Sequence, residues 1–200
     1  TEARELEPND PIIHFALAEL LYFDGQYLRA TREYEVVLDT GEYEINGINL
    51  FSRMADCALQ SGNYSDAIQL FDEISEDEMI SDDFFKKAIA YEKNDLTQEA
   101  IKIMTTLLSK DPDFIQGYFY LQSLYENEKN YPDAIETGKE GLRLNQFYKE
   151  LMVSTGSLEI EHGDANEGVE LLKKALEVDN AYHKPLLILS DLFRQKEDYE

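Results

Sequence analysis

Three short stretches of the sequence share almost the same pattern: GQYLRA at residues 25–30, GNYSDA at residues 62–67 and NYPDA at residues 130–134. The small residue that ends each stretch recurs along the chain at Ala30, Ala67, Ala100, Ala134 and Gly168. The spacings are 37, 33, 34 and 34 residues. A period near 34 is typical of stacked helix hairpins, because one pair of helices cannot bury its own apolar face and must pack on the next pair. The sequence therefore predicts a repeated helix–turn–helix unit.

Other positions fall into register when this small residue is numbered twentieth in each unit. The eighth place holds Ala18, Ala55, Ala88, Gln122 and Gly156. A small residue there lets the two helices of a hairpin approach closely, and Gln122 is the exception. The turn between the helices holds Gly25, Gly62, Asp95, Lys129 and Gly163. Glycine at this turn is expected to reach the left-handed conformation that ends the first helix.

The aromatic residues of the repeat have a structural explanation. Place 24 holds a large residue in four units and a glycine in one, namely Tyr34, Phe71, Met104, Gly138 and Leu172. The turn aromatics are Tyr27, Tyr64 and Tyr131. Apolar residues spaced by three and four positions are how helices bury one face. We therefore expect these aromatics to pack between helices and not to hold a cofactor.

These motifs, together with KDP at residues 110–112, resemble the tetratricopeptide repeat (TPR) family along essentially the whole chain. The resemblance implies an all-α fold, a right-handed α-solenoid (superhelix) of stacked antiparallel helix hairpins, with no β-sheet. Full units are expected at 11–47, 48–80, 81–114, 115–148 and 149–182. Residues 1–10 match the end of a preceding unit and residues 183–200 the first helix of a further one, so the chain resembles a solenoid fragment. The 37-residue step predicts a longer loop around Thr40 to Gly47, with Gly41 and Gly47 as flexible breaks.

Helices are accordingly predicted over 12–23, 28–39, 48–60, 65–75, 82–93, 97–109, 115–128, 132–143, 149–161, 166–178 and 184–195.

Composition and charge restrict the class of partner. Apolar residues make up 43% of the 200 residues and aromatics 12%, which is enough to build a folded core. The chain has 18 basic and 42 acidic residues, for a net charge of −24, and residues 1–85 carry 4 and 20 of them, for −16. Such a charge repels phosphate backbones and anionic lipid heads, so direct nucleic-acid or membrane binding is not expected. A single cysteine, Cys57, and the absence of a spanning apolar run favour a cytoplasmic protein.

The sequence contains no pattern typical of an enzyme. The histidines His14, His162 and His183 are far apart in the repeat frame, and no HExxH, GxSxG, Walker or GxGxxG motif occurs. The acidic stretch from Asp72 to Asp83 has seven carboxylates but no glycine, which excludes an EF-hand loop. We therefore expect no catalytic residue, no metal and no cofactor.

Function is then expected from the surface that stacking creates. In the family that the chain resembles, the first helix of each hairpin lines a concave groove that holds a peptide or helix of a partner protein. The matching fifth and sixth places predict a partner-binding set of Phe15, Arg53, Phe85, Lys86, Phe119 and Tyr120. The alternative for the aromatic members is that they belong to the core between repeats. The resemblance thus predicts a protein–protein interaction scaffold or adaptor.

Other roles stay open at this point. Some members of the family bind chaperone tails through a clamp of Lys, Asn and Arg side chains. Arg53 and Lys86 match two of its positions, but the other places hold Phe15, Glu19, Asn49, Asp82 and Ile89. The clamp is incomplete and partly reversed in sign. A sensory or regulatory domain that controls an attached effector is the second hypothesis. The charge favours a basic or apolar protein ligand, and self-association is left open by the sequence.

Overall fold

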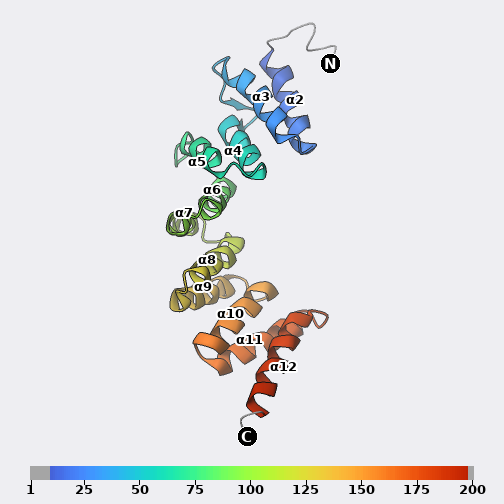
Figure 1. The fold of residues 1–200 in the computed structure, drawn as a ribbon, viewed down its shortest axis with the longest axis vertical. Coiled ribbons are helices and arrows are strands. Elements are labelled where there is room, and N and C mark those ends of the chain that lie inside the picture. Colours follow the sequence, from blue (N-terminus) through green and yellow to red (C-terminus); the bar gives the residue numbers. More distant parts are fainter. Residues whose placement is uncertain (1–9, 198–200) are drawn as a thin grey trace. The chain divides into compact units, whose positions relative to one another are not determined.

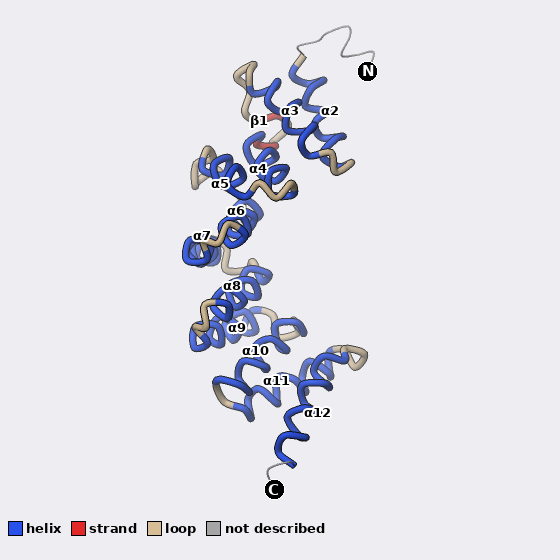
Figure 2. The backbone as a smooth tube through the Cα atoms, in the orientation of Figure 1, coloured by secondary structure: helices blue, strands red, loops and turns tan. Residues whose placement is uncertain are grey.

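The computed structural model describes residues 10–197, which form eleven helices and one short pair of strands (Figures 1 and 2). The elements are α2 (Pro11–Phe23), α3 (Tyr27–Leu38), β1 (Glu44–Ile45), β2 (Ile48–Asn49), α4 (Leu50–Gln60), α5 (Tyr64–Asp72), α6 (Ser81–Lys93), α7 (Thr97–Lys110), α8 (Ile115–Asn127), α9 (Tyr131–Leu144), α10 (Lys149–His162), α11 (Ala165–Val178) and α12 (His183–Glu197). Each predicted helix is present, with ends within three residues of the expected positions. The all-α prediction is confirmed. The expected end of a preceding unit falls almost wholly outside the described residues.

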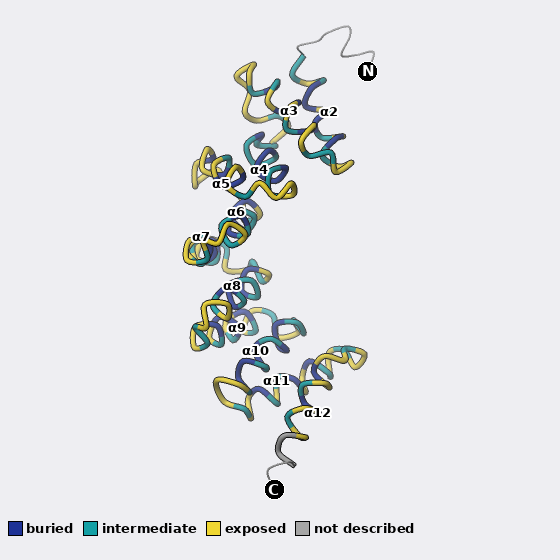
Figure 3. The backbone as a smooth tube through the Cα atoms, viewed as in Figure 1, coloured by how far each residue is buried: buried dark blue, intermediate teal, exposed yellow. Residues whose placement is uncertain are grey.

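The chain divides into two compact units, residues 1–103 and residues 104–200, here called the N-terminal and C-terminal units. In the N-terminal unit α2 pairs with α3 and α4 with α5, while α3 packs on α4 and α5 on α6. In the C-terminal unit α8 pairs with α9 and α10 with α11, while α9 packs on α10 and α11 on α12. Buried residues follow the sides of the helices that face these neighbours (Figure 3). Among residues 10–197, no helix is both long and apolar enough to cross a membrane.

Alanines at places 8 and 20 bring the helices of each N-terminal hairpin together. Ala18 and Ala30 in the first hairpin and Ala55 and Ala67 in the second are fully buried. The large place-24 residues Tyr34 and Phe71 are also fully buried, as predicted. Close packing of this kind leaves no room for larger side chains at the alanine positions.

The two exceptions in the repeat frame compensate for each other in the hairpin of α8 and α9. Gln122 occupies the small place of α8, and Gly138 occupies the large place of α9. A Cβ atom on Gly138 would overlap Thr155 Oγ1 and Gln122 Nε2. Gln122 Nε2 donates a hydrogen bond of 3.0 Å to that Thr155 hydroxyl. The large and small side chains have therefore exchanged helices without a change in the register of the hairpin.

The turn glycines follow the predicted conformation in the N-terminal unit but not in the last hairpin. Gly25 and Gly62 have φ angles of 74° and 78°, and the residues that replace glycine, Asp95 and Lys129, have 60° and 58°. Gly163 has φ −132°, so the left-handed prediction is wrong there. A Cβ atom on Gly163 would overlap the Glu159 carboxylate, so a larger residue there would force the Glu159 side chain to move.

The inserted segment between the first two hairpins forms a two-stranded antiparallel ribbon, where a flexible loop was predicted. Glu44 pairs with Asn49 and Ile45 with Ile48. The two turn residues, Asn46 and Gly47, both have positive φ, 54° and 75°. Positive φ at both central residues defines a type I′ turn, whose twist matches that of the strands. The Asn-Gly dipeptide between two isoleucines is the sequence signal for this ribbon.

Candidate functional site

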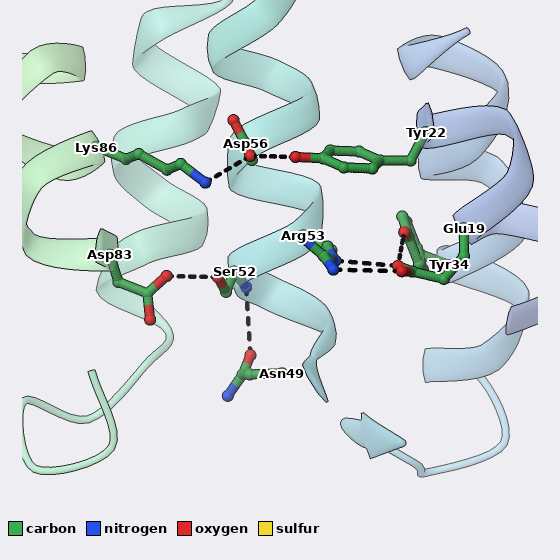
Figure 4. A network of polar contacts seen from close by, with 9 residues as sticks. All are labelled: Glu19, Tyr22, Tyr34, Asn49, Ser52, Arg53, Asp56, Asp83 and Lys86. Atoms are coloured by element: carbon green, nitrogen blue, oxygen red, sulfur yellow. Dashed lines mark hydrogen bonds and ion pairs between the residues drawn. The ribbon is translucent and has the colours of Figure 1, made fainter. Parts of the chain in front are cut away.

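The first helices of the N-terminal unit, α2, α4 and α6, carry a network of polar contacts (Figure 4). Arg53 on α4 faces Glu19 on α2, with Nε 3.0 Å from Oε1 and Nη2 3.3 Å from Oε2. This two-point geometry is the arrangement in which a guanidinium binds a carboxylate most specifically. Arg53 thus ties the second hairpin to the first.

The same arrangement is repeated one unit further along the chain. Lys86 on α6 lies 2.7 Å from Asp56 Oδ2 on α4 and 2.8 Å from Asp82 Oδ2. In both pairs a cation at the sixth place of one unit meets an acid at the ninth place of the unit before it. Because the hairpins stack with a period near 34 residues, these two places lie opposite each other. The repeat geometry therefore produces a ladder of ion pairs.

Tyrosines connect the two ion pairs into one network. The Tyr22 hydroxyl donates a hydrogen bond of 2.5 Å to Asp56 Oδ2, and the Arg53 guanidinium carbon lies 4.8 Å from the centre of the Tyr22 ring. Tyr34, from α3, donates a hydrogen bond to Glu19. In Figure 4 the Asp56 carboxylate lies between the Lys86 ammonium and the Tyr22 hydroxyl. The carboxylates of Glu19 and Asp56 are therefore each paired with a cation inside the protein.

The network changes the pKa of its members. Burial by itself would raise the pKa of Asp56, but hydrogen bonds from Lys86 and Tyr22 outweigh burial and hold it below its ordinary value. Burial opposes the charge of Lys86 too, yet its hydrogen bonds to Asp56 and Asp82 raise the pKa of the ammonium. Burial and the hydrogen bond to Asp56 raise the pKa of Tyr22 to about 12. Both ends of the Lys86–Asp56 pair are thus charged over a wide pH range.

A cavity of about 290 Å³ opens beside this network, and we call it the ribbon cavity. It is lined by the ribbon segment, the start of α4, the segment before α6 and α6 itself. Asn49 caps α4 by accepting hydrogen bonds from the backbone N–H groups of Phe51 and Ser52, at 2.9 and 3.3 Å. The Ser52 hydroxyl donates to Asp83, which also accepts the backbone N–H of Ile80. These bonds hold three lining residues of the cavity, Asn49, Ser52 and Asp83, in place.

One predicted partner residue is buried in the structure, and two others already form ion pairs within the chain. Phe15 is only 6% exposed and packs against Tyr34 with ring centres 6.3 Å apart, so it belongs to the core and not to the surface. Its side chain meets the second helix of its own hairpin. Arg53 and Lys86 are partly exposed but already ion paired, so a carboxylate from a partner would have to displace Glu19 or Asp56. The cations therefore do not form a ready clamp for an acidic tail.

The remaining predicted residues are half-buried and belong to different units. Phe85 lies on α6 in the N-terminal unit. Phe119 and Tyr120 lie on α8 in the C-terminal unit, where the Phe119 ring centre is 5.9 Å from that of Tyr148. The predicted aromatic residues are therefore divided between the two units.

Two reactive side chains of the N-terminal unit, His14 and Cys57, are buried. His14 Nδ1 lies 2.6 Å from Glu33 Oε2, and both residues are buried. Cys57 is 1% exposed, and burial raises the pKa of its thiol to about 11. A protonated, covered thiol is a poor nucleophile. Within residues 10–197, no group of three or more His, Cys, Asp or Glu side chains is placed to hold a metal ion.

Comparison with known proteins agrees with the repeat geometry. A family model described as YpiA-like tetratricopeptide repeats matches residues 1–42, and a model of the tetratricopeptide repeat matches residues 84–113. The TPR repeat-containing protein YpiA of Bacillus subtilis (strain 168) is 30% identical over 199 residues. The chain is thus similar to a TPR repeat-containing protein and matches tetratricopeptide repeat models in two segments. The match covers 100% of this chain and 47% of YpiA, so the chain spans about half the length of that relative.

Solved structures show the same fold. YrrB, described as a TPR protein with an unusual peptide-binding site, aligns with a TM-score of 0.72 and 15% identity over 94% of this chain and 96% of its own. A MamA structure aligns with a TM-score of 0.74 and 19% identity over 87% of this chain and 94% of its own. These likenesses establish the TPR fold of the chain.

Proposed function

We propose that this TPR chain is a protein-binding module whose first helices receive a peptide or a helix of a partner protein. The observation that carries the proposal is the arrangement of α2, α4 and α6, which share a polar network beside an open cavity. The network is rigid because its charges are internally paired, so the surface is preorganised for a ligand. The TPR fold, shared with a peptide-binding protein such as YrrB, supports the same role.

The partly exposed aromatics of the first helices are the proposed anchors. Phe85 serves in the N-terminal unit, and Phe119 with Tyr120 serves in the C-terminal unit. Aromatic side chains that become fully covered contribute much of the binding free energy at many interfaces. Phe15 is no longer part of this set, because it is buried in the core.

Partner capture in cells, by cross-linking the full-length protein, tests this proposal. The variant Phe85→Ala/Phe119→Ala/Tyr120→Ala is expected to lose captured partners and to keep its helical circular dichroism. The control is Leu28→Ala/Phe147→Ala, which removes side chains that are 65% and 66% exposed but lie off the first helices. Equal capture by the two variants, or loss only in the control, would contradict the role of the first helices.

A further inference from the structure

The ribbon cavity lies in the N-terminal unit, at the one step of the repeat that is 37 residues long. The ribbon that the extra residues form provides one wall, through Tyr43, Glu44, Gly47 and Ile48. The Tyr43 carbonyl accepts a hydrogen bond of 2.9 Å from the backbone N–H of Leu50, which fixes the ribbon against the start of α4. The wall is therefore an ordered part of the unit.

Two large side chains at this cavity are exposed to solvent. Tyr43 is 58% exposed, and Ile80, which precedes α6, is 63% exposed. They come from two different segments of the lining, the ribbon segment and the segment that leads into α6. An aromatic ring and an aliphatic side chain are suited to cover the aliphatic stem of a long side chain, and the ring attracts a cation to its face.

The charge of the cavity is strongly negative. Its lining contains two cations, Arg53 and Lys86, and the carboxylates of Glu44, Asp56, Glu78, Asp82 and Asp83. Both cations already have carboxylate partners, whereas the carboxylates of Glu44 and Glu78 are exposed and form no ion pair within the described residues. Residues 1–85 as a whole carry a net charge of −16. The cavity therefore offers negative charge beside an apolar rim.

We infer that the ribbon cavity receives an arginine or lysine side chain from an extended basic segment of the partner protein. The cation would meet Glu44 and Glu78, and its stem would lie between Tyr43 and Ile80. A volume of about 290 Å³ is at the lower end of ligand pockets, so it accepts one side chain and not a larger ligand. The inference rests on the proposed function, because it assigns a partner class to the same face of α4 and α6.

A labelled peptide with the repeated sequence Gly-Arg-Leu-Ser tests this assignment by fluorescence anisotropy, alongside a matched peptide with Gln in place of Arg. The test variant is Tyr43→Ala/Glu44→Gln/Glu78→Gln. The control is Leu28→Ala/Glu35→Gln/Glu73→Gln, which removes the same charge and one exposed apolar side chain from a separate cavity in the same unit. Both variants therefore change the net charge of the protein by the same amount.

We expect the arginine peptide to bind the wild type and the control similarly, and to bind the test variant about tenfold more weakly. The glutamine peptide should bind all three proteins weakly. Equal weakening in the two variants would overturn the site, because binding would then reflect overall charge. If the two peptides bound equally, or if neither bound, the inference that the partner segment is basic would be overturned. The proposed function would still be tested separately, by the capture experiment on the aromatic anchors.

Discussion

The two units differ in the contacts between their first helices, although the C-terminal unit also has an ion pair between successive hairpins, from Lys139 on α9 to Glu159 on α10 at 2.5 Å. In the N-terminal unit, long charged side chains bridge the first helices, as Arg53 does to Glu19 and Lys86 to Asp56. In the C-terminal unit, glycines bring the helices so close that a Cβ atom on Gly138 would overlap its neighbours. The same repeat register therefore tolerates two kinds of contact, one electrostatic and one steric. Substitutions in the two units should fail for different physical reasons.

The largest effect is expected for Gly138→Leu. The new side chain would have to occupy the space of Gln122 and Thr155, and overpacking of this kind costs about 3 kcal/mol of unfolding free energy. Adding Gln122→Ala and Thr155→Ala should restore much of the loss, because the small and large places then follow the other hairpins. Urea unfolding measures both steps. A single variant as stable as the wild type would show that the two places do not face each other.

Asp56→Ala should destabilise the N-terminal unit by about 3 kcal/mol, because it leaves Lys86 and Tyr22 without a buried partner. The matched control is Asp82→Ala, which removes the exposed carboxylate that binds the same ammonium. An exposed pair of this kind contributes less than about 1 kcal/mol. Similar unfolding free energies for the two variants would contradict the central place of Asp56 in the network.

The pH dependence of stability should distinguish the Asp56 contact from the Gln122 contact. Since the pKa of folded Asp56 is lowered, its contribution is present above the unfolded value, about 4, and is lost as the pH falls through the folded value. The raised pKa of Lys86 keeps its contribution present up to about pH 10, with loss only as the pH rises through the folded value. The stability difference between wild type and Asp56→Asn should therefore shrink in acid.

The corresponding difference for Gln122→Ala in the C-terminal unit should not change with pH, because the Gln122–Thr155 hydrogen bond contains no titrating group. Denaturant unfolding between acid and neutral pH measures both differences. A difference for Asp56→Asn that stays constant into strong acid would refute the assigned charge of Asp56.

The smallest effect concerns the turns. Lys129 has φ 58° at a place where Gly25 and Gly62 have 74° and 78°. Lys129→Gly should relieve strain, but the freer unfolded chain offsets part of the gain, which leaves a stabilisation of about 0.5 kcal/mol. Gly25→Ala should have the opposite sign. Thermal unfolding of the pair is a suitable measurement, and destabilisation by Lys129→Gly would count against the strain argument.

The fold could be predicted from the sequence because its signals are local and repeated. A small residue such as Ala30 or Ala67 recurs where helices touch, and a turn residue recurs where the first helix ends. The ribbon was also visible in principle, since Asn46-Gly47 between two isoleucines favours a hairpin. The ribbon was not predicted because the 34-residue period by itself indicates only that extra residues are present, and such residues were assigned to a loop.

The candidate site was less predictable, because it depends on side chains that meet across hairpins. The sequence correctly placed Arg53 and Lys86 on first helices. It predicted, however, that they bind a partner protein and not carboxylates of this chain. Comparing the sixth place of one unit with the ninth place of the unit before would have paired them with Glu19 and Asp56. The burial of Phe15 could not be found in this way, because whether a side chain turns toward its own second helix depends on local packing.

Cys57 gives the N-terminal unit a built-in reporter of local opening. The thiol is the one cysteine of the sequence and is buried against the first two hairpins. A thiol-specific reagent can modify it only after a local opening exposes the thiol, so the labelling rate measures the equilibrium between closed and open forms. The wild-type sequence thus allows a kinetic experiment on one junction of the repeat array without an introduced probe. The same rate, followed while a ligand is added, would show whether binding tightens that junction.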